Sequence, residues 1–347
     1  MLTKKQVNEI KEHLERAQNP LFLFDNDNDG LCSFLLLQRY IGRGKGFPVK
    51  TSPELTKDYF RKVRELEPDY IFILDQPEVA KEFFDEVEKI NLPVVWIDHH
   101  EMDKKKTPKF VNYYNPIFNK KKSNEPVTAL CYQITNKKED MWISIIGCIS
   151  DKFVPEYYSE FKKNFPELSV DSKDAFEIYY NSKIGNLAII FAFALMDRTT
   201  NVINMLKLLM KVKSPYDVLE ENTKTNSMHN RSNELYEKYD NLIKKAKEEA
   251  KHSGKLLFFK YGGDISMSAE VSNKLRYLFP EKVIAVVKVK EGRASFSIRG
   301  NNIKDKVVKI IEKLEGSKGG GHVDAVGARI RVEDLEEFER ELRKSVE

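Results

Sequence analysis

The chain has 347 residues and a net charge of +4, with 41% hydrophobic residues, 32% charged residues, 16 glycines and 13 prolines. This composition is typical of folded globular domains and excludes a disordered or collagen-like chain, and the length favours two domains. The longest apolar run, residues 187–196, is shorter than the ~20 residues that cross a bilayer, so we expect a buried helix there and no membrane contact.

The first residues of the chain and its cysteines point to the cytoplasm. Residues 1–17 are charged and helical in pattern, without the apolar core of a signal peptide. Cys32, Cys131 and Cys148 lie far apart and form no CxxC motif. We therefore expect a cytoplasmic protein without a zinc site or a disulfide framework.

Helical and strand patterns alternate over the first 100 residues. A helix is expected at about 4–17, and helical spacing recurs at 56–66 and 77–90. Short, wholly apolar segments, typical of strands buried on both faces, occur at 21–24, 70–74 and 93–97. This alternation predicts an α/β fold with a doubly wound parallel sheet.

The remainder of the chain predicts a helical region and a second domain. Residues 124–225 are mostly helical in pattern, and a long polar segment with a thin apolar stripe suits a helix that connects two domains. Strand patterns return at 256–261, 282–290 and 294–299. We therefore expect a first domain at 1–225, a connecting helix at 226–252 and a smaller α/β domain at 253–347.

The second domain carries an excess of positive charge. Residues 253–332 contain 16 Lys and Arg against 8 Asp and Glu. Such an excess fits a polyanionic partner, and it also fits a solvated surface.

The first apolar strand leads into three acids at alternate positions, Asp25, Asp27 and Asp29. Close carboxylates repel one another unless a cation neutralises them, and hard oxygen ligands suit Mg²⁺ or Mn²⁺. A calcium loop and a solvated turn are the alternatives. An EF-hand loop starting at Asp25 requires Glu at its twelfth position, which is Leu36, and it follows a helix rather than a strand.

The other two apolar strands also end in ionisable residues, at Asp75 and at Asp98-His99-His100. Carboxyl ends of parallel strands share one edge of the sheet, which is where ligands bind in open α/β folds. Imidazole beside carboxylate favours Mn²⁺. A further acid, Asp151, follows an apolar helical segment and by itself is typical of a helix end.

Five segments in order, FDNDNDG, ILD, WIDHH, ISD and KGGGHVDAVGA (318–328), resemble the motifs of the DHH phosphoesterase superfamily and its C-terminal DHH-associated domain. The first motif resembles RecJ-like nucleases of the archaeal type, since Leu23 stands where short-oligonucleotide phosphodiesterases usually carry His. Gln76-Pro77 and Val323 depart from the RecJ pattern without removing a ligand.

The resemblance implies two Mn²⁺ ions, with Mg²⁺ as an alternative, in an active site between the two domains. Asp75 would bridge the ions, and His100 would be free to contact a phosphate while Asp98 orients a neighbouring group. The remaining metal ligands would be divided between the ions as Asp25 and Asp27 at one, and Asp29, His99 and Asp151 at the other.

The glycine-rich motif of the second domain would bind substrate, because backbone without side chains allows a phosphate or sugar to approach. The residues expected there are Arg299, Gly319, Gly320, Gly321 and His322. A flexible turn is the alternative for the glycines.

Two further features have plain structural explanations. The lysine triplets at 104–106 and 120–122 could line an entrance to the site, although solvated loops are the favoured interpretation. The pair Tyr113-Tyr114 could stack on bases, although packing is favoured.

The leading hypothesis is an Mn²⁺-dependent exonuclease that hydrolyses single-stranded DNA or RNA. One alternative is a phosphodiesterase for short oligonucleotides, phosphoadenosine phosphate or cyclic dinucleotides, which the compact length favours. Another is a DHH scaffold that binds replication or nuclease proteins, although such relatives lose acids that this chain retains. The sequence leaves the polarity of digestion and the oligomeric state open.

Overall fold

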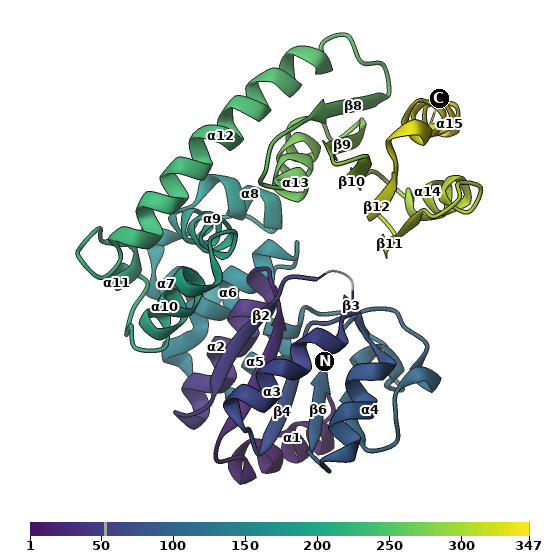
Figure 1. Cartoon of the computed structure of the whole chain (residues 1–347). Coiled ribbons are helices and arrows are strands. Elements are labelled where there is room, and N and C mark those ends of the chain that lie inside the picture. Colours follow the sequence, from purple (N-terminus) through teal and green to yellow (C-terminus); the bar gives the residue numbers. More distant parts are fainter. Residues whose placement is uncertain (52–53, 347) are drawn as a thin grey trace. The chain divides into compact units, whose positions relative to one another are not determined.

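The computed structural model describes residues 1–51 and 54–346. The chain divides into two compact units, Met1–Ser232 and Asn233–Glu347. A 25-residue helix, α12 (Asn226–Ala250), starts in the first unit and continues into the second (Figure 1).

A five-stranded parallel sheet forms the centre of the first unit, with the strand order β2-β1-β4-β6-β7. Its strands are β1 (Pro20–Asp25), β2 (Lys45–Val49), β4 (Tyr70–Leu74), β6 (Val94–Ile97) and β7 (Val111–Tyr114). The predicted doubly wound sheet is therefore confirmed. The chain leaves β1 toward β2 on one side and returns to β4 on the other, so the strand order reverses between β1 and β4.

The two outer strands, β2 and β7, were not predicted from the sequence because they are not wholly apolar. In β2 the sequence KGFPV contains Gly and Pro, and only its last two residues are buried. In β7 the sequence VNYY is half-buried at its two central positions. Edge strands need to bury fewer side chains than central ones, so their sequence signal is weaker.

Each central strand contributes alternate side chains to two separate cores. Phe22, Phe24 and Phe72 point to one face, where they join the largest hydrophobic cluster of the unit. Leu21 and Leu23 point to the other face and join a second cluster with Trp96. Because successive strand residues alternate between faces, a wholly apolar strand requires helices on both sides.

Helices cover both faces of this sheet (Figure 1). The second cluster is closed by α3 (Phe60–Leu66) and α4 (Lys81–Lys89). Two short strands, β3 (Glu54–Leu55) and β5 (Glu78–Val79), pair beside it. The largest cluster is closed by the helices α1 (Lys4–Arg16), α2 (Asn28–Ile41), α5 (Val127–Thr135), α6 (Met141–Ser150), α7 (Tyr158–Asn164), α8 (Ala175–Asn181), α9 (Lys183–Leu195), α10 (Thr199–Leu209) and α11 (Tyr216–Leu219).

The second unit is a smaller α/β fold with a mixed sheet in the order β11-β12-β10-β9-β8. Only β8 and β9 are parallel. Phe258, Phe296 and Phe338 lie in its main hydrophobic cluster. The elements are β8 (Leu256–Tyr261), α13 (Ser268–Leu278), β9 (Val283–Lys290), β10 (Arg293–Arg299), α14 (Lys304–Ile311), β11 (Lys318–His322), β12 (Ala325–Arg331) and α15 (Leu335–Val346).

Within residues 1–51 and 54–346, no single helix has the length and apolar character needed to cross a bilayer. Helices α8 and α9 would reach that length only as a pair, and they meet at a bend of 83°.

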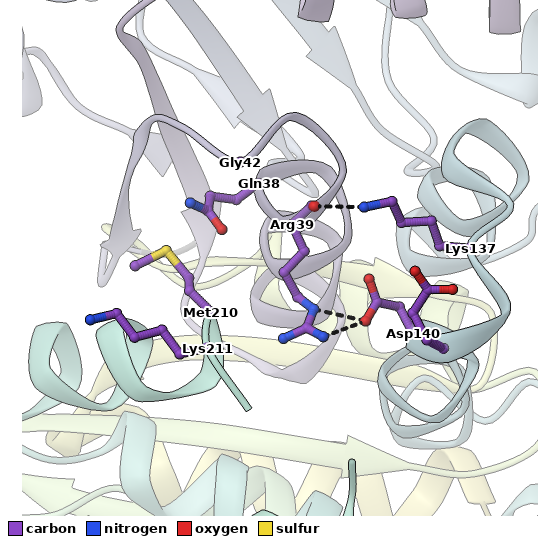
Figure 2. A pocket seen from close by; sticks show the side chains of 8 residues that line it. Gln38, Arg39, Gly42, Lys137, Asp140, Met210 and Lys211 are labelled. Atoms are coloured by element: carbon purple, nitrogen blue, oxygen red, sulfur yellow. Dashed lines mark hydrogen bonds and ion pairs between the residues drawn. The ribbon is translucent and has the colours of Figure 1, made fainter. Parts of the chain in front are cut away.

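A cavity of about 350 Å³ lies at the C-terminal end of α2. Figure 2 shows Arg39 there, paired with Asp140 at the start of α6. Arg39 Nε donates to Asp140 Oδ1 at 2.8 Å, and Arg39 Nη1 donates to the carbonyls of Leu209 and Val212 at 3.0 and 2.7 Å. One guanidinium thereby ties together α2, the start of α6 and the end of α10.

We predict that Asp140→Ala destabilises the first unit strongly, because Asp140 is only 2% exposed and its loss leaves the Arg39 guanidinium, itself only 12% exposed, without its carboxylate partner. A broken buried pair costs about 3–5 kcal/mol. The measurement is urea unfolding of the full chain. Glu139→Ala is the matched control, since Glu139 lines the same cavity but is exposed, and it should change stability by less than ~0.5 kcal/mol. Equal effects of the two variants would contradict the prediction.

Candidate metal centre

The turn after β1 is held in shape by a close backbone contact and a helix cap. A Cβ added at Gly30 would lie 2.3 Å from the carbonyl oxygen of Asp25, so only glycine fits there. Asp27 is the N-cap of α2, and its Oδ1 accepts from the backbone N–H of Gly30 at 2.9 Å. Asp25 closes β1, and its Oδ1 accepts from the N–H of Asn26 at 2.8 Å.

Asp29 also holds the start of a second helix. Its two carboxylate oxygens accept from the backbone N–H groups of Val127 and Thr128 at 2.8 and 2.7 Å, and its carbonyl accepts from the Thr128 hydroxyl at 2.9 Å. A carboxylate has about four lone-pair sites, so Asp29 retains capacity for a cation. Substituting Asp29 would also remove the N-terminal support of α5, which makes it a poor probe of function.

Asp75 follows β4 in a backbone conformation that most residues avoid. Its φ is 58°, in the left-handed region, and its N–H donates to the carbonyl of Ile97 at 3.0 Å. The residue is only 2% exposed. A non-glycine residue in this conformation is strained, and such strain is concentrated at functional sites.

The structure brings the predicted ligands together in two neighbouring groups. The ligand atoms of Asp25, Asp27 and Asp75 lie within 4.8 Å of one another. Asp29, His99 and Asp151 form a second group within the same limit.

Asp75 lies close to both imidazoles of the WIDHH segment. Its Oδ1 is 3.4 Å from His99 Nε2 and 3.8 Å from His100 Nδ1. His99 Nε2 is also 3.8 Å from Asp151 Oδ2. Asp75, a member of the first group, therefore also lies beside His99 of the second. Asp151, at the C-cap of α6, belongs to the cluster as well as to the helix end.

His100 is oriented by Asp98, in a network with two residues that the sequence did not point to, Tyr113 and Asn115. Its Nδ1 lies 2.8 Å from Asp98 Oδ1, and Asp98 is fully buried. The Tyr113 hydroxyl donates to Asp98 Oδ2 at 3.0 Å, and Asn115 Nδ2 donates to the His100 carbonyl at 2.9 Å. If residues 111–114 had been recognised as a parallel edge strand, Tyr113 and Asn115 would have been predicted to lie at the carboxyl edge of the sheet, beside Asp98.

The pKa values of the acids in the cluster are raised above their ordinary values. Burial and the neighbouring Asp27 raise the pKa of Asp25 to about 8. Desolvation and the nearby Asp29 raise the pKa of Asp151 to about 8. Burial and the surrounding carboxylates also raise the pKa of Asp75 well above its ordinary value.

The two imidazoles shift in opposite directions. Burial and the adjacent His100 lower the pKa of His99 to about 4, which keeps that ring neutral and able to act as a ligand. Burial opposes the charge on His100, but the hydrogen bond and the charge of Asp98 outweigh it and raise the pKa of His100 to about 9.

The cluster has the residue composition of a divalent metal site, and several of its buried polar atoms have no hydrogen-bond partner. Asp75 Oδ1, Asn26 Oδ1 and both polar atoms of the Gln76 amide are buried without a hydrogen-bond partner. Carboxylate oxygens with one imidazole nitrogen suit Mn²⁺ or Mg²⁺. These residues could therefore hold a metal ion, and binding would satisfy carboxylates that otherwise repel one another.

The second unit brings the predicted substrate-binding residues to one end of its sheet. Arg299 of β10 and His322 of β11 both pair with Ala325 of β12, so their side chains lie on the same face. Arg299 Nε donates to Asn273 Oδ1 at 2.7 Å. Substrate binding by these residues stays a prediction.

The glycines of this motif form the edge strand β11. Side chains are excluded at two of them by the unit's own packing, since a Cβ at Gly319 would meet Ile311 and one at Gly321 would lie 2.3 Å from the Ala325 carbonyl. A Cβ at Gly320 has nothing within 4 Å. The requirement for glycine at Gly319 and Gly321 is therefore explained within the unit, whereas Gly320 faces open space.

Carboxylates and imidazoles gather at the carboxyl edge of a parallel sheet. This arrangement is typical of metal-binding α/β proteins. Two family models match the chain, the DHH family N-terminal domain over residues 21–149 and the DHHA1 domain over residues 253–347. The chain is therefore a DHH superfamily protein, as its five motifs suggested.

Solved structures share this fold at low sequence identity. RecJ in complex with Mn²⁺ from Thermus thermophilus is 14% identical, with a TM-score of 0.71, and the match covers 99% of this chain and 54% of that one. The chain thus spans about half the length of that RecJ.

Two smaller proteins match over nearly their whole length. A pGpG-specific phosphodiesterase from Vibrio cholerae is 15% identical with a TM-score of 0.50, and the match covers 95% of this chain and 99% of that one. CDC45 from Entamoeba histolytica is 9% identical with a TM-score of 0.53, covering 98% of both chains. No curated protein matches the chain in sequence.

We predict that Mn²⁺ stabilises the protein much more at pH 8 than at pH 5.5. The raised pKa values mean that the folded state holds protons which the unfolded chain, with carboxyl pKa values near 3.9, has released. The metal-free protein therefore loses this contribution to stability as the pH rises from about 4 through 8, and protons compete with the metal over the same range. The measurement is the Tm with chelator and with Mn²⁺ at each pH, and equal Mn²⁺ shifts would count against the site.

We predict that Asp75→Asn stabilises the metal-free protein at pH 8 and abolishes the stabilisation by Mn²⁺. Asn tolerates the left-handed backbone at this position, and unlike Asp75 it does not have to retain a proton at pH 8 that the unfolded chain releases. A gain of ~1 kcal/mol raises Tm by roughly 2–4 °C in a unit of this size. Thermal unfolding with and without Mn²⁺ measures both effects. Asp58→Asn, at an exposed acid outside the cluster, is the control and should change neither.

Proposed function

We propose that this chain is a metal-dependent phosphodiesterase, with Mn²⁺ as the preferred metal, that hydrolyses single-stranded DNA or RNA from an end. The observation that carries the proposal is that two ligand groups lie side by side at the carboxyl edge of the sheet, with Asp75 of the first group 3.4 Å from His99 of the second. The similar RecJ from Thermus thermophilus was solved in complex with Mn²⁺ and in complex with Mg²⁺, which supports a divalent metal here.

In this proposal Asp25 and Asp27 would hold one cation, Asp29, His99 and Asp151 would hold a second, and Asp75 would be a ligand of both. Such a pair of cations would supply Lewis-acid activation of water and neutralise charge on the phosphoryl oxygens.

The chain's own residues orient the substrate. His100 is held through Nδ1 by Asp98, and in this proposal its imidazole would donate to a phosphate oxygen. The buried Asp98, held by Tyr113, stabilises the charged ring during this contact. Arg299 and His322 in the second unit would bind further phosphates, since guanidinium forms two parallel hydrogen bonds with such groups.

Hydrolysis of very short substrates is the second candidate, favoured by the whole-length match to the pGpG-specific phosphodiesterase. A scaffold role alone, suggested by the match to CDC45, fits less well. A protein without catalysis has no need for several mutually repelling acids, which cost stability unless a cation binds.

The test is a time course on end-labelled DNA and RNA of 2 to about 20 nucleotides, with Mn²⁺, Mg²⁺ or chelator. We predict cleavage of the 20-mer with Mn²⁺ and none with chelator. Asp27→Asn should lower the cleavage rate by more than ~10–100-fold, which is the loss expected for a residue that only supports a metal ligand. The variant should keep the folding stability of the wild type, because Asn also caps helices well. Full activity of Asp27→Asn, or cleavage in chelator, would falsify the proposal.

A further inference from the structure

The segment between the WIDHH motif and α5 carries an unusual charge. Residues 104–122 contain seven lysines and no acidic residue. All seven are exposed. We call these residues the lysine collar: Lys104, Lys105, Lys106, Lys109, Lys120, Lys121 and Lys122.

The collar lysines have no acidic partners within the described residues. Elsewhere in the first unit, exposed lysines commonly sit beside an acid, as in Lys81 with Asp85 and Lys138 with Glu160, each at 2.8 Å. Across residues 1–51 and 54–346 no ion pair involves a collar lysine, and the contact found is Lys104 Nζ at 5.5 Å from the centre of the Phe118 ring. Seven charges without ion-pair partners repel one another, so an external anion is their natural counterpart.

Both lysine triplets of the collar lie close to His100 of the metal centre. Its first triplet forms the 3₁₀ turn η2 (Lys104–Lys106), four residues beyond His100 and so within ~14 Å of it along the chain. Before the second triplet, Asn115 contacts the His100 carbonyl and caps the turn η3 (Pro116–Phe118) through the N–H of Ile117 at 3.0 Å. The contact between Lys104 and Phe118 brings the two triplets to the same side of the unit.

We infer that the lysine collar binds the phosphates of a single-stranded nucleic acid that lie beyond the scissile bond. The inference rests on the proposed function, and it makes a strand of several nucleotides, rather than a dinucleotide, the favoured substrate. Lysines are flexible point charges that bind phosphate without reading bases, so DNA and RNA should be held alike. The collar lies outside the five motifs. The sequence alone favoured solvated loops for its two lysine triplets, and a phosphate-binding surface replaces that interpretation.

The chain offers a matched control at the other end of α2. Lys207, Lys211 and Lys213 are exposed and form no ion pair within the part of the chain that the structure describes. Lys211 lines the cavity with Arg39 at the C-terminal end of α2 (Figure 2). The 14 residues of α2 place that end about 20 Å from the metal centre at its N-terminus.

The first experiment measures binding without hydrolysis. Anisotropy of labelled DNA and RNA 20-mers is followed in chelator over a range of salt concentrations, for wild type, K104Q/K105Q/K106Q, K120Q/K121Q/K122Q and the control K207Q/K211Q/K213Q. Each neutralised phosphate of a single strand contributes ~0.7 to the slope of log K against log salt. Each collar triple should therefore lower the slope by up to about 2, while the control leaves it unchanged.

The second experiment measures kcat/KM with Mn²⁺ on a dinucleotide and on the 20-mer. Each collar triple should reduce the value for the 20-mer at least about tenfold and leave the value for the dinucleotide within about threefold of wild type. The thermal midpoint of each variant reports whether it is folded.

The outcomes separate the collar from the proposed function. Collar variants with an unchanged salt slope, or a control triple with an equal effect, overturn the collar inference. A preference of the binding for DNA or RNA alone would contradict recognition through phosphates. If wild type cleaves neither substrate, the proposed function fails, and the salt slopes in chelator still decide whether the collar holds a strand.

Discussion

The mutual repulsion of carboxylates at one edge of a sheet is the constraint around which the first unit is built. Asp25, Asp75 and Asp151 are held close enough for their pKa values to rise far above those of free side chains. A fold that only needed stability would gain by replacing them. Their presence together is therefore an argument for a cation, whose charge turns the same proximity into attraction.

The backbone holds this arrangement in place before any cation binds. The N-terminus of α2 is capped by Asp27, and that of α5 donates two N–H groups to Asp29. Helix N-termini carry partial positive charge, so both helices offset part of the acidic charge. The left-handed backbone of Asp75 shows that local strain is also accepted to bring its carboxylate to the edge.

The sequence predicted the central strands, and the gathering of ionisable residues at their carboxyl ends, for a physical reason. Strands 21–24, 70–74 and 93–97 are apolar on both faces, and parallel strands align their carboxyl ends, so Asp25, Asp75 and His99 had to meet. Tyr113 and Asn115 were missed because edge strand β7 alternates too weakly to be recognised. The packing of Gly321 against β12 depends on strand pairing between β11 and β12, which residue patterns within one segment do not reveal.

The acidic cluster and the lysine collar are best understood as one electrostatic arrangement. A polyanionic strand is repelled by the acids while the metal site is empty, and the same strand is attracted by the collar lysines a few residues away. Bound cations would remove the first effect and leave the second. Metal binding would therefore raise the affinity for a strand even at positions that contact no metal, and the strand would in turn hold the cations more tightly, because linkage between two binding sites is reciprocal.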